Sequence, residues 1–133
     1  MRQIKFRAWH EQGFMLDVEN IVKLNLEEEI LEYCVLNEDG VRSDRECSFD
    51  EIELMQYTGI EDENGKEIWE HDRVKIKGKK GEYGIGYCCG SFSAFKIDGR
   101  GATDLIDLEK LHSEVEVIGT AYDPERPFNR VSL

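Results

Sequence analysis

The chain has 133 residues, of which 40% are apolar and 35% charged, so it can bury about one domain's core beneath a heavily charged surface. No stretch approaches the roughly 20 apolar residues that cross a bilayer, so we expect no membrane-spanning helix. The net charge of −12 disfavours non-specific binding to phosphate-rich nucleic acid. The start of the chain lacks the continuous apolar segment of a signal peptide, so we expect a cytoplasmic protein.

The acidic charge is unevenly distributed along the chain. It distinguishes an acidic, β-rich N-terminal region, residues 1–68, from a nearly neutral C-terminal region, residues 69–133, and we expect the two regions to form one compact unit. Residues 1–68 hold 18 acidic and 7 basic residues, whereas residues 69–133 hold 11 acidic and 10 basic residues. The high glycine content and the two prolines favour short strands joined by turns over a helical bundle. We therefore predict a mainly β protein, in which an N-terminal β-hairpin region is joined to a small C-terminal SH3-like β-barrel or roll with one short helix.

Hydrophobic alternation predicts the strands of the N-terminal region. Residues 4–9 alternate with period two, residues 11–13 form a turn, and residues 14–16 are the return strand of a hairpin. The apolar residues of the segment 21–36 fit the helical period and the strand period only in part, and we favour a strand after Ile30. The remaining predictions are a turn at residues 37–40, a polar loop at residues 42–50 and a strand at residues 51–57.

The stretch from Gln56 to Asp72 connects the two regions. Gly59 can adopt positive φ, and Asn64-Gly65 is a strong tight-turn signal. Ile68 and Trp69 then supply two large apolar side chains in an otherwise acidic connection. We predict that Trp69 is buried against the barrel and that Ile68 packs between the two regions.

The C-terminal region has the pattern of a small curled sheet. Alternating apolar residues predict strands at residues 73–77, 83–88, 91–97 and 115–122. The spacing of Leu105, Leu108 and Leu111, with Asp104 as a cap, predicts a short helix over residues 103–112 that lies on the barrel. The glycines around residue 80 lack both the Gly-Lys-Ser/Thr of a phosphate loop and the strand-to-helix context of a dinucleotide site.

No constellation of residues points to catalysis, a metal or a cofactor. The four cysteines contain no Cys-x-x-Cys pair, the adjacent Cys88 and Cys89 point to opposite faces of a strand, and the three histidines are scattered. We expect reduced thiols, no disulfide between Cys88 and Cys89, and no bound metal. No serine or cysteine occupies a recognisable nucleophile motif, so we predict a protein that is not an enzyme.

Three segments resemble the YopX family of phage and prophage proteins. They are the opening strand at residues 4–9, the segment 55–59 followed by Asp62 and residues 64–68, and the closing segment at residues 115–120 with Tyr122. The resemblance implies a mainly β fold with an SH3-like barrel in the later part of the chain, and no agreed biochemical activity. His71 departs from the family pattern, which usually has glycine before the aspartate. His71 must then adopt a glycine-like backbone, with φ > 0, or the turn differs here.

Three kinds of function fit these observations. The preferred one is a non-enzymatic phage or prophage accessory protein of the host cytoplasm that binds another protein, and the many sheet edges are compatible with a homo-oligomer. The second is a nucleic-acid-associated barrel that uses charge and stacking. The third is an acidic decoy that imitates DNA. Under the second hypothesis, the nucleic-acid-binding surface would consist of seven residues: Lys75, Lys77, Lys79, Lys80, Tyr83, Tyr87 and Phe92.

Overall fold

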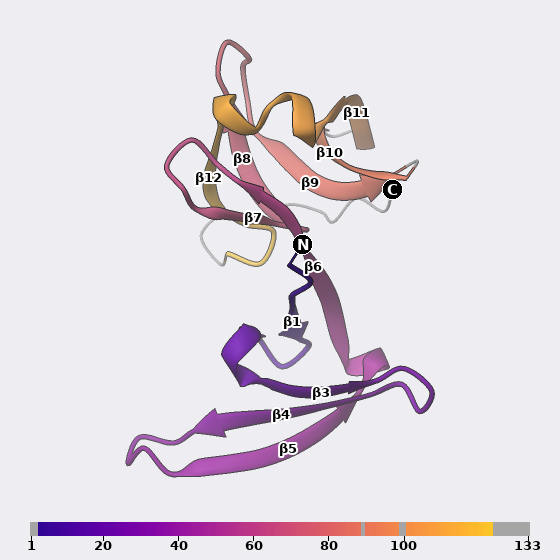
Figure 1. The fold of residues 1–133 in the computed structure, drawn as a ribbon, viewed down its shortest axis with the longest axis vertical. Coiled ribbons are helices and arrows are strands. Elements are labelled where there is room, and N and C mark those ends of the chain that lie inside the picture. The colour runs from indigo at the N-terminus through magenta and orange to yellow at the C-terminus, as the bar shows by residue number, and fades with distance from the viewer. Residues whose placement is uncertain (1–2, 89, 99–100, 124–133) are drawn as a thin grey trace. The chain divides into compact units, whose positions relative to one another are not determined.

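The computed structural model describes residues 3–88, 90–98 and 101–123 (Figure 1). Two compact units are formed, one by residues 4–56 and the other by Gln3 and the described residues between Tyr57 and Asp123. All strand pairs in both units are antiparallel, and no α-helix occurs in the ranges just given. The boundary expected after Ile68 falls on a strand of the second unit, Glu67–Trp69.

The first unit combines a hairpin with a three-stranded sheet. Strands β1 (Phe6–His10) and β2 (Phe14–Leu16) form the hairpin, and β1 also pairs with the first part of β6 (Ile52–Glu61). The separate sheet has the order β3 (Ile21–Asn25), β4 (Ile30–Leu36) and β5 (Arg42–Ser48). Two 3₁₀ turns, η1 (Val18–Asn20) and η2 (Phe49–Glu51), precede β3 and β6. The core of the unit is built from five buried residues: Ala8, Leu16, Leu31, Tyr33 and Cys47.

The predicted hairpin, the strand after Ile30 and the strand that enters β6 are confirmed. The polar loop predicted for residues 42–50 is wrong, because Arg42–Ser48 is strand β5 and pairs with β4 without interruption from Arg42 to Ser48. Most of its side chains are exposed, and only Cys47 is buried. A strand with one solvated face needs few apolar residues, so the polar composition of β5 resembles that of a loop and led to the wrong prediction.

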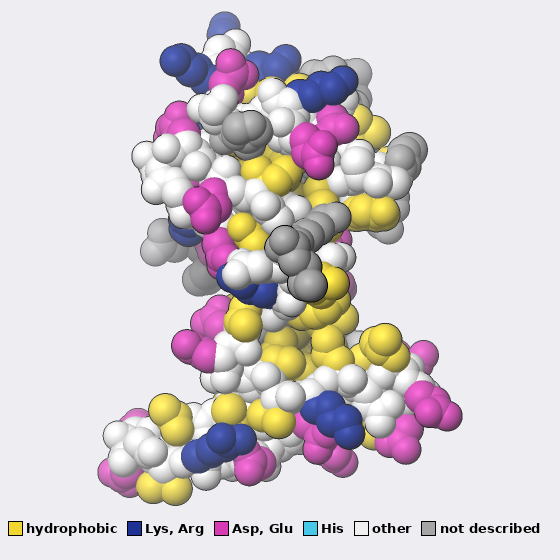
Figure 2. Space-filling view, viewed as in Figure 1, with side chains coloured by type: hydrophobic (Ala, Val, Ile, Leu, Met, Phe, Trp, Pro, Cys, Tyr) yellow, Lys and Arg dark blue, Asp and Glu magenta, His cyan; other side chains and the backbone are white. Residues whose placement is uncertain are grey.

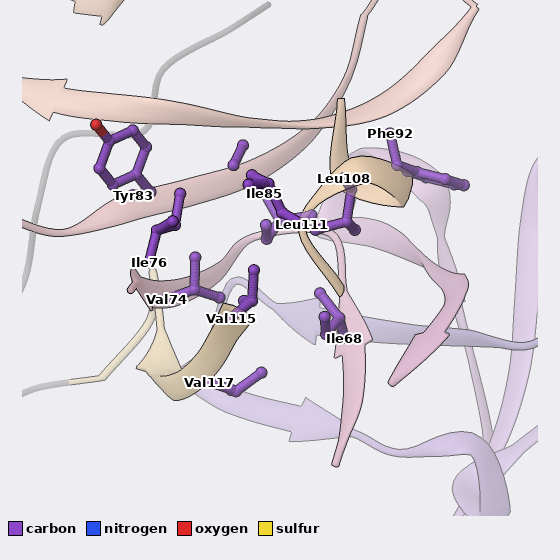
Figure 3. Close-up of a cluster of buried hydrophobic side chains, with 11 residues drawn as sticks. Ile68, Val74, Ile76, Tyr83, Ile85, Phe92, Leu108, Leu111, Val115 and Val117 are labelled. Atoms are coloured by element: carbon purple, nitrogen blue, oxygen red, sulfur yellow. The ribbon is translucent and has the colours of Figure 1, made fainter. Parts of the chain in front are cut away.

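The second unit is built on a five-stranded sheet with the order β11, β10, β9, β8 and β12. These strands span Gly101–Asp107, Ser91–Asp98, Tyr83–Cys88, Asp72–Ile76 and Val115–Thr120. A short strand, β7 (Glu67–Trp69), pairs with the last part of β6. Side chains from these elements meet in one core, shown in Figure 3, and Ile68 is one of its fully buried members. Four of these strands, β8, β9, β10 and β12, were predicted from the sequence.

The helix predicted over residues 103–112 is wrong. The first part of this range is strand β11, and two 3₁₀ turns follow, η3 (Leu108–Lys110) and η4 (His112–Glu114). Asp107 caps η3 by accepting a hydrogen bond from the Glu109 amide at 3.0 Å. Leu108 and Leu111 are both buried, and a spacing of three residues also fits the three residues per turn of a 3₁₀ helix.

The turn between β7 and β8 explains how His71 stands in a position where a glycine is expected. Its φ is +67°, so of the two alternatives left open by the sequence, the glycine-like left-handed backbone is the one that the turn adopts. The His71 amide donates to Ile85 O at 2.9 Å, and its carbonyl accepts from the Ala121 amide at 2.8 Å. Asp72 closes the turn by accepting from the Trp69 amide at 2.8 Å. Trp69 is buried, as predicted, and its ring lies 5.5 Å from that of Tyr57.

Candidate functional site

The four lysines of the predicted nucleic-acid surface are exposed on β8 and on the turn that follows it. Lys75 lies on the outer side of β8, and Lys77, Lys79 and Lys80 lie in the exposed connection to β9. Figure 2 shows basic side chains gathered at this end of the second unit. The four lysines therefore form an exposed, positively charged surface.

The aromatic side chains expected beside these lysines are mostly not available. Tyr83 and Phe92 are core residues with 2% and 7% of their surface exposed, because they point inward from β9 and β10. Tyr87 is 54% exposed, and its ring packs edge-on against Phe92 at 5.1 Å. The predicted surface is thus reduced to the four lysines and Tyr87, since a buried ring offers no face for stacking.

An open hollow of about 650 Å³ lies elsewhere in the second unit, beside the irregular part of β6. Its wall is formed by Tyr57, Gly59, Ile60, Glu61 and Asp62, together with Glu109 of η3. Glu61 and Glu109 are exposed, and none of these six residues is basic. The hollow is therefore acidic, with an apolar component from Tyr57 and Ile60.

A β-bulge shapes this wall. Tyr57 is opposite Trp69 and Glu61 is opposite Glu67, so β6 uses more residues than β7 over the same ladder. Thr58 holds the bulge, because its hydroxyl donates to Ile68 O at 2.7 Å and accepts from the Ile60 amide at 3.2 Å. Gly59, with φ +84°, supplies the left-handed residue that the bulge needs.

The loop after the bulge is organised by the buried carboxylate of Asp62. Its Oδ1 accepts from the amides of Asn64 at 2.9 Å and Lys66 at 2.8 Å, and its Oδ2 accepts from the Val117 amide of β12 at 2.9 Å. Burial alone would raise the pKa of Asp62, but the three amides, with Lys66, hold it below its ordinary value. The Glu63 amide also donates to Val115 O at 3.0 Å, so this loop covers the outer edge of β12.

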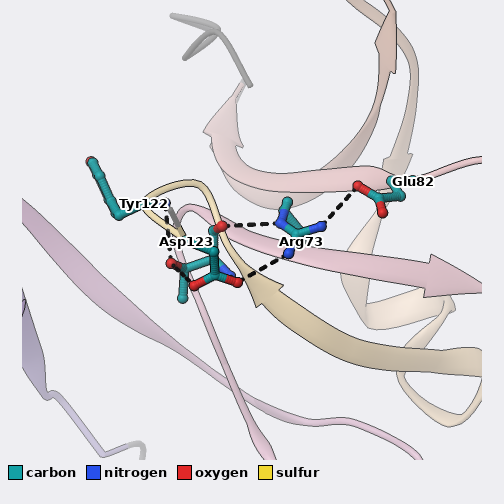
Figure 4. Close-up of polar contacts among 5 residues, drawn as sticks. Arg73, Glu82, Tyr122 and Asp123 are labelled. Carbon is teal, nitrogen blue, oxygen red and sulfur yellow. Dashed lines mark hydrogen bonds and ion pairs between the residues drawn. The ribbon is translucent and has the colours of Figure 1, made fainter. Parts of the chain in front are cut away.

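A second polar network, drawn in Figure 4, is centred on buried Arg73 of β8. Its guanidinium donates to Glu82 Oε2 and Asp123 Oδ2, each at 3.0 Å, and to Thr120 O at 3.0 Å. Burial opposes the charge on Arg73, but the two carboxylates raise its pKa above its ordinary value. Burial likewise opposes the charge on Asp123, but bonds from Thr120 and Arg73 hold its pKa below its ordinary value. All of these groups pair with one another, so the network serves the fold.

A third cluster lies in the first unit and joins His10, Cys47 and Glu51, whose ligating atoms are within 4.8 Å of one another. His10 and Cys47 are buried, and the Glu51 side chain is 46% exposed. His10 Nε2 lies 4.0 Å from Glu51 Oε2, while its Nδ1 accepts from the Gln12 amide at 3.1 Å. Burial, and then the nearby Glu51, raise the pKa of the Cys47 thiol.

The family model of the YopX protein matches residues 5–126 of this chain. The chain belongs to the YopX family. The segment at residues 55–68 that resembles YopX forms the bulge of β6 and the loop held by Asp62. Its glycines supply positive φ, and its polar residues make the hydrogen bonds that hold the bulge and the loop.

Two solved structures share the fold. YopX from Bacillus subtilis is 18% identical, with a TM-score of 0.63 over 97% of this chain and 100% of that chain. Protein EF1440 from Enterococcus faecalis is 22% identical, with a TM-score of 0.58 over 92% of this chain and 95% of that chain. No curated protein matches the chain significantly.

Sequence reasoning missed both the acidic hollow and the cluster of His10, Cys47 and Glu51. Glu109 joins the hollow from a turn that was predicted as a helix, and Cys47 lies on a strand that was predicted as a loop. Cys34 and Cys47 are free thiols, and the predicted absence of a disulfide between Cys88 and Cys89 is not tested because Cys89 lies outside the described residues. Within the described ranges, no helix is both long and apolar enough to cross a membrane.

Proposed function

We propose that this YopX-family protein is a non-enzymatic phage or prophage accessory protein of the bacterial cytoplasm, and that it binds a basic segment of a protein partner in the acidic hollow of the second unit. The observation that carries the proposal is the composition of the hollow. Two exposed carboxylates, Glu61 and Glu109, lie at its wall without any basic lining residue. A net charge of −12 adds a long-range attraction for a basic partner.

The chemistry of the hollow suits a lysine or arginine side chain. Such a side chain can place its aliphatic part against the half-buried Ile60 while its charge stays near Glu61 and Glu109. The β6 bulge holds Tyr57 and Ile60 in place, so the wall is preorganised. The hollow is open and polar, which suits reversible binding better than enclosure of a substrate. Its lining contains no histidine, cysteine or serine.

The test compares the partners recovered with tagged protein from host cells. The double variant Glu61→Lys/Glu109→Lys reverses the charge of the hollow, and Glu114→Lys/Glu116→Lys makes the same charge change at exposed positions outside its lining. We expect one protein to be recovered with the wild type and the control but not with the hollow variant. Its affinity, measured with purified components, should fall as salt rises. Equal recovery with all three proteins would contradict the proposal.

Nucleic-acid binding is the second candidate, favoured by the four exposed lysines on β8 and its turn. It would use the SH3-like barrel expected for the second unit, with Tyr87 as the one exposed ring of the predicted surface. Four phosphate contacts give a small electrostatic term against the net negative charge of the chain. Titration of labelled single and double strands at two salt concentrations, with Lys79→Glu/Lys80→Glu as control, separates the two candidates. Submicromolar, salt-sensitive binding that the control abolishes would favour the nucleic-acid candidate.

A further inference from the structure

We propose that His10, Cys47 and Glu51 form a binding site for one zinc ion in the first unit. The three residues supply a nitrogen, a sulfur and an oxygen donor, all within 4.8 Å of one another. They come from three different elements, the end of β1, the inner side of β5 and the end of η2. Their convergence therefore depends on the fold and is invisible in the sequence.

The backbone explains why these side chains meet. Ser48 Oγ accepts from the Asp50 amide at 3.2 Å and the Phe49 amide donates to Glu29 O at 2.9 Å, which turns the chain directly after β5. Glu51 then lies beside the end of β1, because its carbonyl accepts from the Glu11 amide at 2.9 Å. His10 is opposite the next residue, Ile52, in the ladder between β1 and β6. Main-chain hydrogen bonds thus fix both the turn that follows Cys47 and the position of Glu51 beside β1.

The three ligand atoms need to move only slightly closer together to bind a zinc ion. Zinc bonds of about 2.0–2.3 Å in a tetrahedron place the ligand atoms roughly 3.3–3.8 Å apart. His10 and Cys47 are fixed by burial, with 5% and 7% of their surfaces exposed. The partly exposed Glu51, now 4.0 Å from His10 Nε2, is the ligand with freedom to close the site. Three protein ligands leave the fourth tetrahedral position for water.

The donor set selects the metal. A thiolate and a carboxylate together neutralise the charge of a divalent zinc ion, and an imidazole completes the mixture that zinc prefers. Calcium and magnesium favour sites made of oxygen ligands alone. Binding displaces the proton of the Cys47 thiol into solvent as the zinc–sulfur bond forms.

The hydrogen bond at His10 Nδ1 must change when zinc binds. Nδ1 now accepts from the Gln12 amide, so the ring carries its proton on Nε2. A zinc ion on Nε2 requires that proton to move to Nδ1, and the Gln12 amide must then turn to another acceptor. Gln12 lies in an exposed turn where water can replace the lost acceptor. Zinc binding is therefore expected to shift the NMR resonance of the Gln12 amide.

The experiment uses full-length, tag-free, reduced protein stripped with a chelator and dialysed against zinc. We expect one zinc per chain, and with cobalt in place of zinc we expect a sulfur-to-metal charge-transfer band. Cys47→Ser should abolish this band, and Glu51→Gln should weaken zinc binding by about 10-fold or more. The matched controls are Cys34→Ser, a free thiol of β4, and Glu46→Gln, an exposed acid of β5; both should bind zinc as the wild type does.

Two results would overturn the proposal: no zinc bound to the reduced wild-type protein, or zinc binding that Cys47→Ser and Glu51→Gln leave unchanged. Circular dichroism of each metal-free variant reports whether it folds. Substitution of His10 or Cys47 alters the core and can unfold the unit. Glu51→Gln changes a partly exposed side chain without changing its size, so its zinc affinity decides the outcome in that case.

Discussion

Replacing Asp62 by asparagine tests the hydrogen bonds that hold the loop beside the hollow. The carboxylate accepts three backbone amides, two at Oδ1 and one at Oδ2. Asparagine has the same shape but only one acceptor atom, so in its best orientation its NH₂ group faces the Val117 amide. One charge-assisted bond is then lost and a buried amide is left without an acceptor, which should destabilise the protein by about 2–3 kcal/mol.

The assay is urea unfolding of Asp62→Asn, with Glu63→Gln as a control that removes the same charge from an exposed neighbour. The control should change the free energy of unfolding by less than about 0.5 kcal/mol. The folded-state pKa of Asp62 lies below its ordinary value of 3.8, so its stabilising effect is complete above that pH and is lost as pH falls through the folded-state pKa. The gap between wild type and variant should therefore be larger at about pH 7 than at about pH 3. A variant as stable as the control at neutral pH would refute this account of the loop.

Other substitutions test the remaining structural assignments by the same unfolding assay. Trp69→Ala should cost about 3–5 kcal/mol because the ring is buried against Tyr57, and an unchanged midpoint would show that it is exposed. Arg73→Gln should cost about 2–3 kcal/mol because it leaves two partly buried carboxylates without their cation, whereas Arg42→Gln, which breaks an exposed pair, should cost under about 1 kcal/mol. His71→Gly should be more stable than His71→Ala by about 1 kcal/mol, since both lose the imidazole and only glycine adopts φ +67° without strain; equal stabilities would count against strain at this turn.

Local signals predicted the turns and most strands of this protein. Asn64-Gly65 marked a turn in which Gly65 has φ +80°, and the departure from the family pattern at His71 marked a position where positive φ was one of two alternatives. These features depend on the backbone geometry of single residues, which a sequence expresses directly. Alternation in β1 and β12 is equally local, since each strand has one side more buried than the other.

Features that depend on pairing were harder to predict. Strand β5 is defined by its ladder with β4, and its solvated face gives it the composition of a loop. The spacing of Leu108 and Leu111 fits both kinds of helix, and the structure selects the shorter one. The candidate sites share this difficulty, because the hollow unites Gly59 with Glu109 and the zinc site unites His10 with Cys47. No local pattern relates such residues.

The bond between Asp62 and Val117 has a consequence for the synthesis of the protein. The two residues are 55 positions apart, so at about 5–20 residues per second a ribosome needs roughly 3–11 s to extend the chain from one to the other. During this interval the buried acceptor Oδ2 lacks its partner, and β8 lacks the neighbour on its outer side that β12 provides. A nascent chain therefore presents an unpaired edge of β8 until β12 emerges. Closure of the Asp62 loop onto β12 is therefore a late step in the folding of the second unit, because it cannot occur before Val117 has been synthesised.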